Sequence, residues 1–228
     1  MFRKIFIHIP KNAGMTIRRS PQLQNRIIVC GSQVHKSPQY SQAVQKTMTK
    51  HGDHHGFEHA RWRDLDENVT LDLKAQAFAV IRNPWDRVVS RYFFAKKVIE
   101  IEKKQSVNYA DVSSFEAFLE ERHKWGSEKY MWHRAVRGWY NAHDHVTDVV
   151  GNLRCDMMRF ENLNEDLIKY FGLASMSGAR NVTALNKGTY KDVYTPETIQ
   201  IVADWYKKDI DFWGYDFDTG ATRKFWND

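Results

Sequence analysis

The segment KIFIHIPKNAGMT, residues 4–16, indicates how the chain folds. Its first half, Lys4–Ile9, is β-branched and aromatic and is closed by Pro10, which is the pattern of a short buried strand. Gly14 and Thr16 then open a helical stretch. A strand, a tight loop and a helix in this order are typical of the first unit of a parallel α/β sheet.

Strands and helices alternate along the rest of the chain. The strongest strand is Ala77–Ile81, and Pro84 follows where a helix can begin, since proline is tolerated in the first helical turn. This alternation predicts an α/β fold with a mainly parallel sheet, and no linker divides residues 1–228 into two domains. The other predicted strands are 26–30, 146–150 and 157–160, and the other predicted helices are 37–50, 59–66, 114–123, 127–139, 162–170 and 196–212.

Bulk composition narrows the classes of protein. With 228 residues, 42% hydrophobic and 14% aromatic, the chain is expected to be a packed globular domain. Its net charge of +6 suits an anionic partner, although a modest excess can serve solubility alone. The basic residues are dispersed, so we expect no nucleic-acid partner. No signal peptide or membrane-length apolar run is visible, so we expect a cytoplasmic protein without stable membrane insertion, in a bacterial or viral setting.

The loop after the first strand carries groups that bind phosphate. Lys11 supplies a positive charge, Gly14 lets the backbone approach a ligand closely, and Thr16 supplies a hydroxyl. Backbone N–H groups at the start of a helix favour an anion. The loop lacks the Walker A spacing, and an ordinary strand-to-helix turn is the alternative. The predicted phosphate contacts are Lys11, Asn12, Ala13, Gly14, Met15 and Thr16.

The second such segment is AVIRNPWDRVVSRY. Its Arg82 stands at the end of a buried strand, where ligands bind in open α/β sheets, and Ser90 lies about two turns into the next helix. The two side chains can converge on one phosphate; the alternative is a surface arginine and a solvated serine. Arg87 is expected to form an ion pair with Asp86 or Glu161, which is a structural role.

The two segments resemble the 5′-phosphosulfate loop and the 3′-phosphate motif of sulfotransferases that use 3′-phosphoadenosine 5′-phosphosulfate (PAPS). They look closest to the branch with the Golgi carbohydrate sulfotransferases and their bacterial relatives. That branch carries a Pro-Lys-x-Ala-Gly-Thr-Ser-like loop and an Arg-x-Pro-x-x-Arg-x-x-Ser-x-Tyr segment. The chain matches the second outright, but has Met15 and Thr16 at the end of the first. Residues 159–163, 185–187 and 209–217 resemble later elements of the family.

The resemblance implies a fold, a donor and a reaction. The fold would be a P-loop-like three-layer sandwich with a central, mainly parallel sheet. PAPS would lie across the carboxyl ends of the strands, with its 5′-phosphosulfate on the Lys11–Thr16 loop, its 3′-phosphate on Arg82 and Ser90, and Lys187 closing over it. The acceptor would be a hydroxyl group on a glycan. No metal is implied, because lysine and arginine supply the positive charge.

Four histidines gather in HGDHHGFEH, residues 51–59. The i, i+4 spacings raise a metal hypothesis, but Gly52 and Gly56 argue against one continuous helix, so solvated loop histidines are favoured. His59 differs from the others, because the related sulfotransferases place a histidine thought to be the catalytic base before the arginine strand. Histidine suits that task because its pKa lies near working pH. The alternative is a histidine that caps a helix.

Two other functions stay open from the sequence. A P-loop kinase would need a Walker A loop and a Mg²⁺-binding aspartate after a strand, and the chain shows neither. A non-catalytic protein that binds nucleotides or polyanions would need only the fold. Acceptor pockets in such enzymes are built from variable loops and helices, and here we expect them over residues 36–56 and 106–144.

Overall fold

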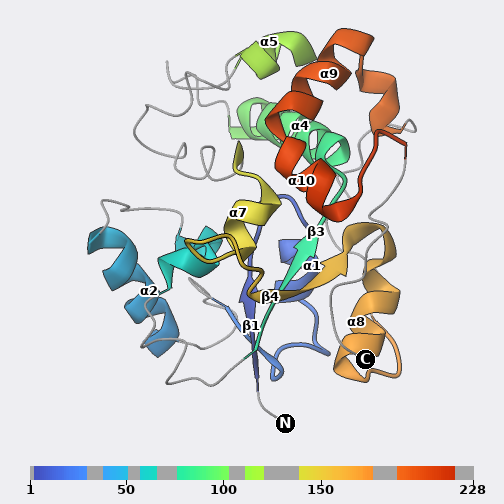
Figure 1. Cartoon of the computed structure of the whole chain (residues 1–228). Helices are drawn as coiled ribbons and strands as arrows, with labels where there is room; N and C mark the ends of the chain where they lie inside the picture. The colour runs from blue at the N-terminus through green and yellow to red at the C-terminus, as the bar shows by residue number, and fades with distance from the viewer. Residues whose placement is uncertain are drawn as a thin grey trace.

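A computed structural model gives the fold. Within its described residues, four strands form one parallel sheet in the order β2-β1-β3-β4 (Figure 1). The predicted parallel α/β fold is therefore confirmed. The strands are β1 (Lys4–Ile7), β2 (Ile27–Ile28), β3 (Ala77–Ile81) and β4 (Cys155–Arg159). The structure describes residues 3–29, 38–50, 57–65, 76–102, 111–120, 139–176 and 189–218.

Helices cover both faces of the sheet and make three layers. Alternate residues of β3 point to opposite faces and all five are buried, as a central parallel strand requires. Phe78 and Val80 pack with residues of α1 and α8, whereas Ala79 and Ile81 pack with residues of α2, α4, α7 and α9. The helices are α1 (Gly14–Arg18), α2 (Pro38–Lys50), α4 (Pro84–Glu102), α5 (Phe115–Glu120), α7 (Ala142–Val146), α8 (Leu163–Phe171), α9 (Pro196–Trp205) and α10 (Lys207–Trp213).

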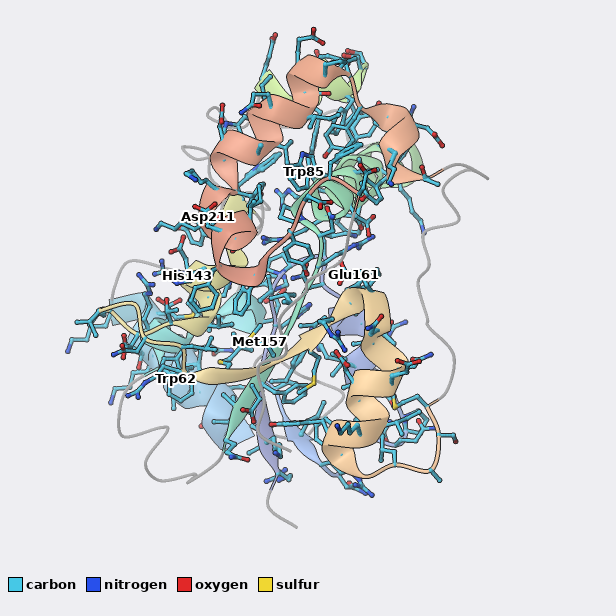
Figure 2. All side chains as sticks on the ribbon, turned by 45° about the vertical axis from the view of Figure 1, so that its right-hand side comes forward. Trp62, Trp85, His143, Met157, Glu161 and Asp211 are labelled. Atoms are coloured by element: carbon cyan, nitrogen blue, oxygen red, sulfur yellow. The ribbon has the colours of Figure 1, made fainter. Side chains whose placement is uncertain are left out.

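The long helix α4 rises from the carboxyl end of β3 (Figure 1). It begins at Pro84 as predicted, because the Asn83 Oδ1 atom accepts from the backbone N–H of Trp85 at 3.0 Å and so caps the helix. The Trp85 indole donates to the Ile199 carbonyl at 3.0 Å, and the Tyr194 hydroxyl donates to the Trp85 carbonyl at 2.9 Å. Figure 2 shows Trp85 where the C-terminal helices meet α4. These contacts fix the start of α4, and with it the end of β3.

The predicted strand over residues 146–150 is wrong. Val146 ends α7, and Thr147 forms only an isolated antiparallel bridge with Leu153. Between these two residues the Asp148 carboxylate accepts backbone N–H groups, including that of Asn152 at 2.9 Å, and so closes a turn. Residues 147–150 therefore form a turn after α7 and not a strand.

Two predicted helices are also corrected. The stretch 196–212 is divided at Tyr206, which is fully buried, with φ −109° and ψ 22°, between α9 and α10. Residues 59–66 are predicted to form one short helix, but the structure has two short 3₁₀ turns, η1 (Phe57–His59) and η2 (Trp62–Asp64). Most of the predicted helix 127–139 lies outside the described residues. Every described helix is too short or too polar to cross a bilayer.

Candidate active site

The loop between β1 and α1 has an unusual backbone. Lys11 and Ala13 have φ values of 67° and 60°, in the left-handed region that non-glycine residues seldom occupy. Such strain tends to gather at functional sites. The first hydrogen bond of α1 is donated by the Ile17 N–H to the Ala13 carbonyl at 3.1 Å. The N–H groups of Gly14 and Met15 precede that bond and have no acceptor within the helix, so they can serve an anion.

Glycine at position 14 is required by a close contact. A Cβ atom placed there would lie 1.7 Å from the Nε2 atom of His8, far inside van der Waals contact. The sequence analysis expected Gly14 to admit a phosphate, but the neighbour that the structure brings to this position is the buried His8 ring. The sequence analysis placed His8 at the end of the first strand and gave its side chain no role.

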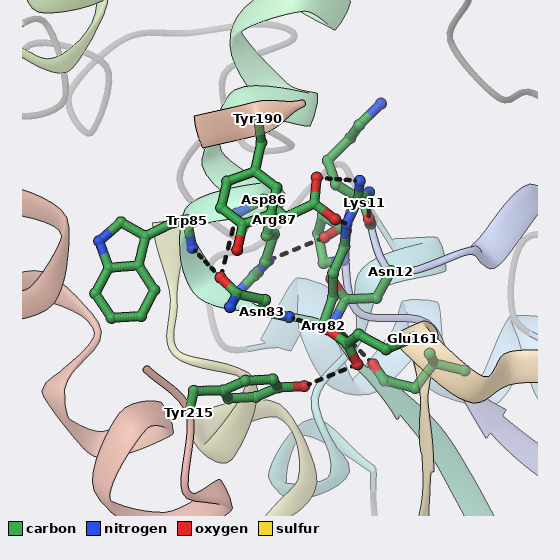
Figure 3. Close-up of polar contacts among 12 residues, drawn as sticks. Lys11, Asn12, Arg82, Asn83, Trp85, Asp86, Arg87, Glu161, Tyr190 and Tyr215 are labelled. Atoms are coloured by element: carbon green, nitrogen blue, oxygen red, sulfur yellow. Dashed lines mark hydrogen bonds and ion pairs between the residues drawn. The ribbon is translucent and has the colours of Figure 1, made fainter. Parts of the chain in front are cut away.

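The loop is tied directly to the second segment (Figure 3). The Asn12 side-chain amide donates to the Val80 carbonyl at 2.7 Å, and the Arg82 guanidinium donates to the Lys11 carbonyl at 2.9 Å. Asn12 and Val80 are 68 residues apart, and β1 and β3 are neighbours in the sheet. The two segments that carry the predicted phosphate ligands therefore lie together at the carboxyl ends of adjacent strands.

Arg87 also holds the loop, with partners other than those predicted. Its Nε atom donates to the Pro10 carbonyl at 3.1 Å, and its Nη1 atom donates to the Tyr140 carbonyl at 2.9 Å. Among the residues that the structure describes, its ion-pair partner is Asp209, at 4.0 Å. The predicted ion pair with Asp86 or Glu161 is thus wrong, because the side chain turns inward beneath the loop. Its structural role stands, as the side chain is 1% exposed.

Arg82 is held in place and keeps donors to spare. The Asp86 carboxylate accepts from its Nε and Nη2 atoms at 2.7 Å each, and Phe160 packs under its guanidinium at 4.0 Å. With the bond to the Lys11 carbonyl, three of the five N–H donors of the guanidinium are used within the described part of the chain. Ser90 lies one turn beyond Asp86 on the same face of α4. Arg82, Asp86 and Ser90 are thus spaced four residues apart along the chain.

Glu161 lies beside the candidate site, although the sequence analysis named it only as a partner for Arg87 and as part of the 159–163 element. Its carboxylate accepts the backbone N–H of Asn83 at 2.7 Å and faces the Tyr215 hydroxyl at 3.5 Å. Burial raises the pKa of Glu161, while the hydrogen bond from Asn83 opposes that shift. Glu161 thus joins the end of β4 to the start of α4, immediately beside Arg82 (Figure 3).

The electrostatics of the loop centre on Lys11. Its ammonium lies 4.2 Å from the centre of the Phe94 ring, which is half exposed. Burial, followed by the charges of Arg82, Arg91 and Lys97, lowers the pKa of Lys11 from 10.5 to about 7. Burial also lowers the pKa of Arg91 to about 10. Burial and mutual repulsion thus disfavour the charged forms of these cations, and a bound anion would stabilise the charged forms.

His59 contacts His8, the first residue after β1. Its Nδ1 atom is 2.9 Å from the backbone carbonyl of His8, and the two imidazole rings are 4.3 Å apart. Because a carbonyl only accepts hydrogen bonds, Nδ1 must carry the proton. Nε2 is then the basic nitrogen of the neutral ring. His59 ends η1 and does not open a helix, so the alternative of a helix cap is not what the structure shows.

The remaining predicted residues have a simpler account. Thr16 is buried at the start of α1, and Met15 beside it is half-buried. Lys187 lies outside the described residues, as do the other three histidines of the cluster, so their predictions stay untested. In the ranges that the structure does describe, no group of three or more histidine, cysteine, aspartate or glutamate side chains is arranged to hold a metal.

A parallel α/β sheet with a lysine loop joined to an arginine segment at its carboxyl edge is an architecture that many phosphate-binding α/β proteins share. Comparison with protein families makes the assignment specific, because the model of the sulfotransferase family matches residues 4–216. The chain therefore belongs to the sulfotransferase family, whose members transfer a sulfonyl group to an acceptor. No curated protein matches the chain.

Proposed function

We propose that the protein transfers the sulfonyl group of PAPS to an acceptor hydroxyl. The observation that carries the proposal is the junction of the two segments, in which Arg82 donates to the Lys11 carbonyl. A donor with phosphate at both its 5′ and 3′ ends needs two anion sites at a fixed separation. The loop Lys11–Thr16 is assigned to the 5′-phosphosulfate, and Arg82 with Ser90 to the 3′-phosphate. Residues 1–228 are proposed to act as a single sulfotransferase domain.

Lys11 is assigned to the leaving group. As the acceptor oxygen attacks sulfur in line, the bond from sulfur to the 5′-phosphate oxygen breaks, and negative charge builds on that phosphate. An ammonium beside it stabilises this charge more than the charge of the ground state, which lowers the barrier. The cations around Lys11 add to the same field. No metal is needed for this step in the proposal, since lysine and arginine supply the positive charge.

His59 is assigned as the general base. Its Nδ1 proton is held by the His8 carbonyl, so Nε2 is the nitrogen that can accept the proton of the acceptor hydroxyl. Only the tautomer with an unprotonated Nε2 can act as the base, so a fixed tautomer keeps every neutral molecule competent for catalysis. Lys187, outside the described residues, is proposed to close over the donor.

The acceptor hydroxyl is proposed to belong to a glycan. Support comes from the resemblance of the Arg82–Tyr92 segment to that of carbohydrate sulfotransferases. The half-exposed Phe94 ring beside Lys11 also offers an apolar face of the kind on which sugar rings pack.

Thermal unfolding with three ligands tests this function against its rivals. A donor site predicts that 3′,5′-ADP, the product of the reaction, raises the melting temperature most, because a ligand that binds only the folded state stabilises it. Stabilisation by ATP that depends on Mg²⁺ would instead indicate a kinase, and stabilisation by heparin alone a binder of polyanions. 5′-AMP is a matched control, since it lacks the 3′-phosphate and should stabilise the protein less than 3′,5′-ADP.

A further inference from the structure

Two buried histidines from separate elements meet beside the loop. His8 follows β1 and His59 ends η1, 51 residues later in the chain. Each is 9% exposed, and the ring centres are 4.3 Å apart with 56° between the planes. The His8 ring therefore forms one wall of the space that the His59 ring occupies, while the His8 carbonyl holds the Nδ1 proton of His59.

The His8 ring is itself fixed on its other sides. It stacks on Phe6 with ring centres 5.6 Å apart and 21° between the planes, and its Nε2 edge lies against Gly14. Its Nδ1 atom is buried without a hydrogen-bond partner among the described residues. A buried polar atom without a hydrogen bond destabilises the folded state, so a phenylalanine would be the more stable choice if packing were the only purpose.

His8 stays neutral in this setting. Burial, first of all, lowers its pKa well below 6.5, and nearby charged or chargeable groups act in the same direction. These groups face the ring from η1, α1, α7 and the loop; they are His59, Arg18, His145 and Lys11. A neutral ring does not repel a proton that arrives on its neighbour, whereas a charged ring would. His8 can thus sit in contact with a base without opposing its protonation.

We propose that His8 is a positioning residue, whose ring keeps His59 turned with Nδ1–H on the His8 carbonyl and Nε2 unprotonated. This inference rests on the proposed role of His59 as the base. It explains why Gly14 must lack a side chain, since a Cβ atom there would displace the His8 ring. It also joins the base to the donor loop, because His8 is the first residue of the connection from β1 to α1 that carries this loop.

Nitrogen NMR of the ¹⁵N-histidine-labelled protein tests this inference, because the two ring nitrogens of each tautomer have distinct shifts. The signals of His59 are assigned by their loss in His59→Gln. In the natural protein between pH 7 and 8 we expect a single tautomer with only Nδ1 protonated. In His8→Ala, the His59 ring gains room to turn, and we expect shifts averaged between both tautomers. His143→Ala, at a histidine on α7 outside the pair, should leave the His59 signals unchanged.

Two further measurements keep the inference apart from folding and from the proposed function. His8→Gln fills most of the space without a ring, so it should show the same averaging even if His8→Ala folds poorly. The Kd for 3′,5′-ADP should stay within about threefold of the natural value in both variants, because the anion ligands are untouched. The positioning role would be overturned if the His59 tautomer were unchanged in both variants. It would also be overturned if the Kd for 3′,5′-ADP rose more than tenfold in these variants. Failure of the natural protein to bind 3′,5′-ADP would instead overturn the proposed function.

Discussion

Binding of the product 3′,5′-ADP should take up a proton near neutral pH, and Lys11 should be the group that gains it. In the empty site, burial and the charges of Arg82, Arg91 and Lys97 lower the pKa of Lys11 to about 7. A phosphate dianion beside the ammonium reverses the balance and returns the pKa towards its ordinary 10.5. The sign follows directly: the complex binds more protons than the free protein above pH 7, so affinity must fall as pH rises.

The magnitude can be worked from this pKa. At pH 7 about half of the free molecules carry the Lys11 proton, and at pH 8 about one in ten do, so uptake should be about 0.5 proton at pH 7 and about 0.9 at pH 8. If the site binds only with Lys11 charged, Kd rises about fivefold between these pH values. The second ionisation of the ligand phosphates lies near pH 6 and adds little in this range.

Isothermal titration calorimetry in buffers of different ionisation enthalpy measures the uptake directly. The matched control is Lys11→Arg, which keeps the positive charge but cannot lose its proton in this range. Its uptake should be near zero and its Kd nearly flat from pH 7 to 8. Equal proton uptake by the natural protein and by Lys11→Arg would refute the reasoning, because the proton would then belong to another group.

Three variants test other parts of the site. Gly14→Ala should bind 3′,5′-ADP at least tenfold more weakly by calorimetry, since its Cβ would lie 1.7 Å from His8 Nε2; an unchanged Kd would show that the loop can yield. Arg82→Ala should weaken binding by about 10- to 100-fold, as expected for a charged hydrogen-bond donor, while the exposed Arg154→Ala should not; equal losses in both would remove the 3′-phosphate assignment. His59→Ala should lower kcat about 100-fold or more with little change in Kd, and near-normal turnover would remove it as the base.

The parts of the fold that are encoded locally could be predicted from the sequence. β3 and the start of α4 were predicted at their observed bounds, since a buried apolar run ends at Ile81 and Asn83 and Pro84 then cap and open a helix. The strand, loop and short helix over residues 4–18 were predicted for the same reason. In each case neighbours in the chain carry the whole signal.

The elements that the sequence did not predict correctly depend on partners distant in the chain. α7 begins where it does because the Asp209 carboxylate accepts the N–H groups of Ala142 and His143, at 2.7 Å and 2.8 Å. Burial raises the pKa of that carboxyl to about 6, which only the folded packing produces. Nothing within residues 142–150 signals this contact, so the apolar residues there were taken for a strand.

The site shows the same division. The anion-binding residue types of the loop and the arginine segment were visible in the sequence, and their meeting followed from the rule for parallel sheets. The bonds that hold the loop were not visible, since Arg87 reaches back 77 residues to the Pro10 carbonyl. The contact of His8 with His59 was also hidden, because it joins the end of a strand to a turn whose form the sequence did not predict.

The central claim is sulfonyl transfer from PAPS, and transfer of label from ³⁵S-PAPS to a panel of unsulfated glycans tests it most directly. We predict that the natural protein labels at least one glycan and releases 3′,5′-ADP in equal amount. Lys11→Ala should label the same glycan about 100- to 1000-fold more slowly, because the leaving phosphate loses its counter-charge. Labelling by Lys11→Ala at the natural rate would contradict the account, as would a natural protein that binds 3′,5′-ADP but transfers no label to any hydroxyl acceptor.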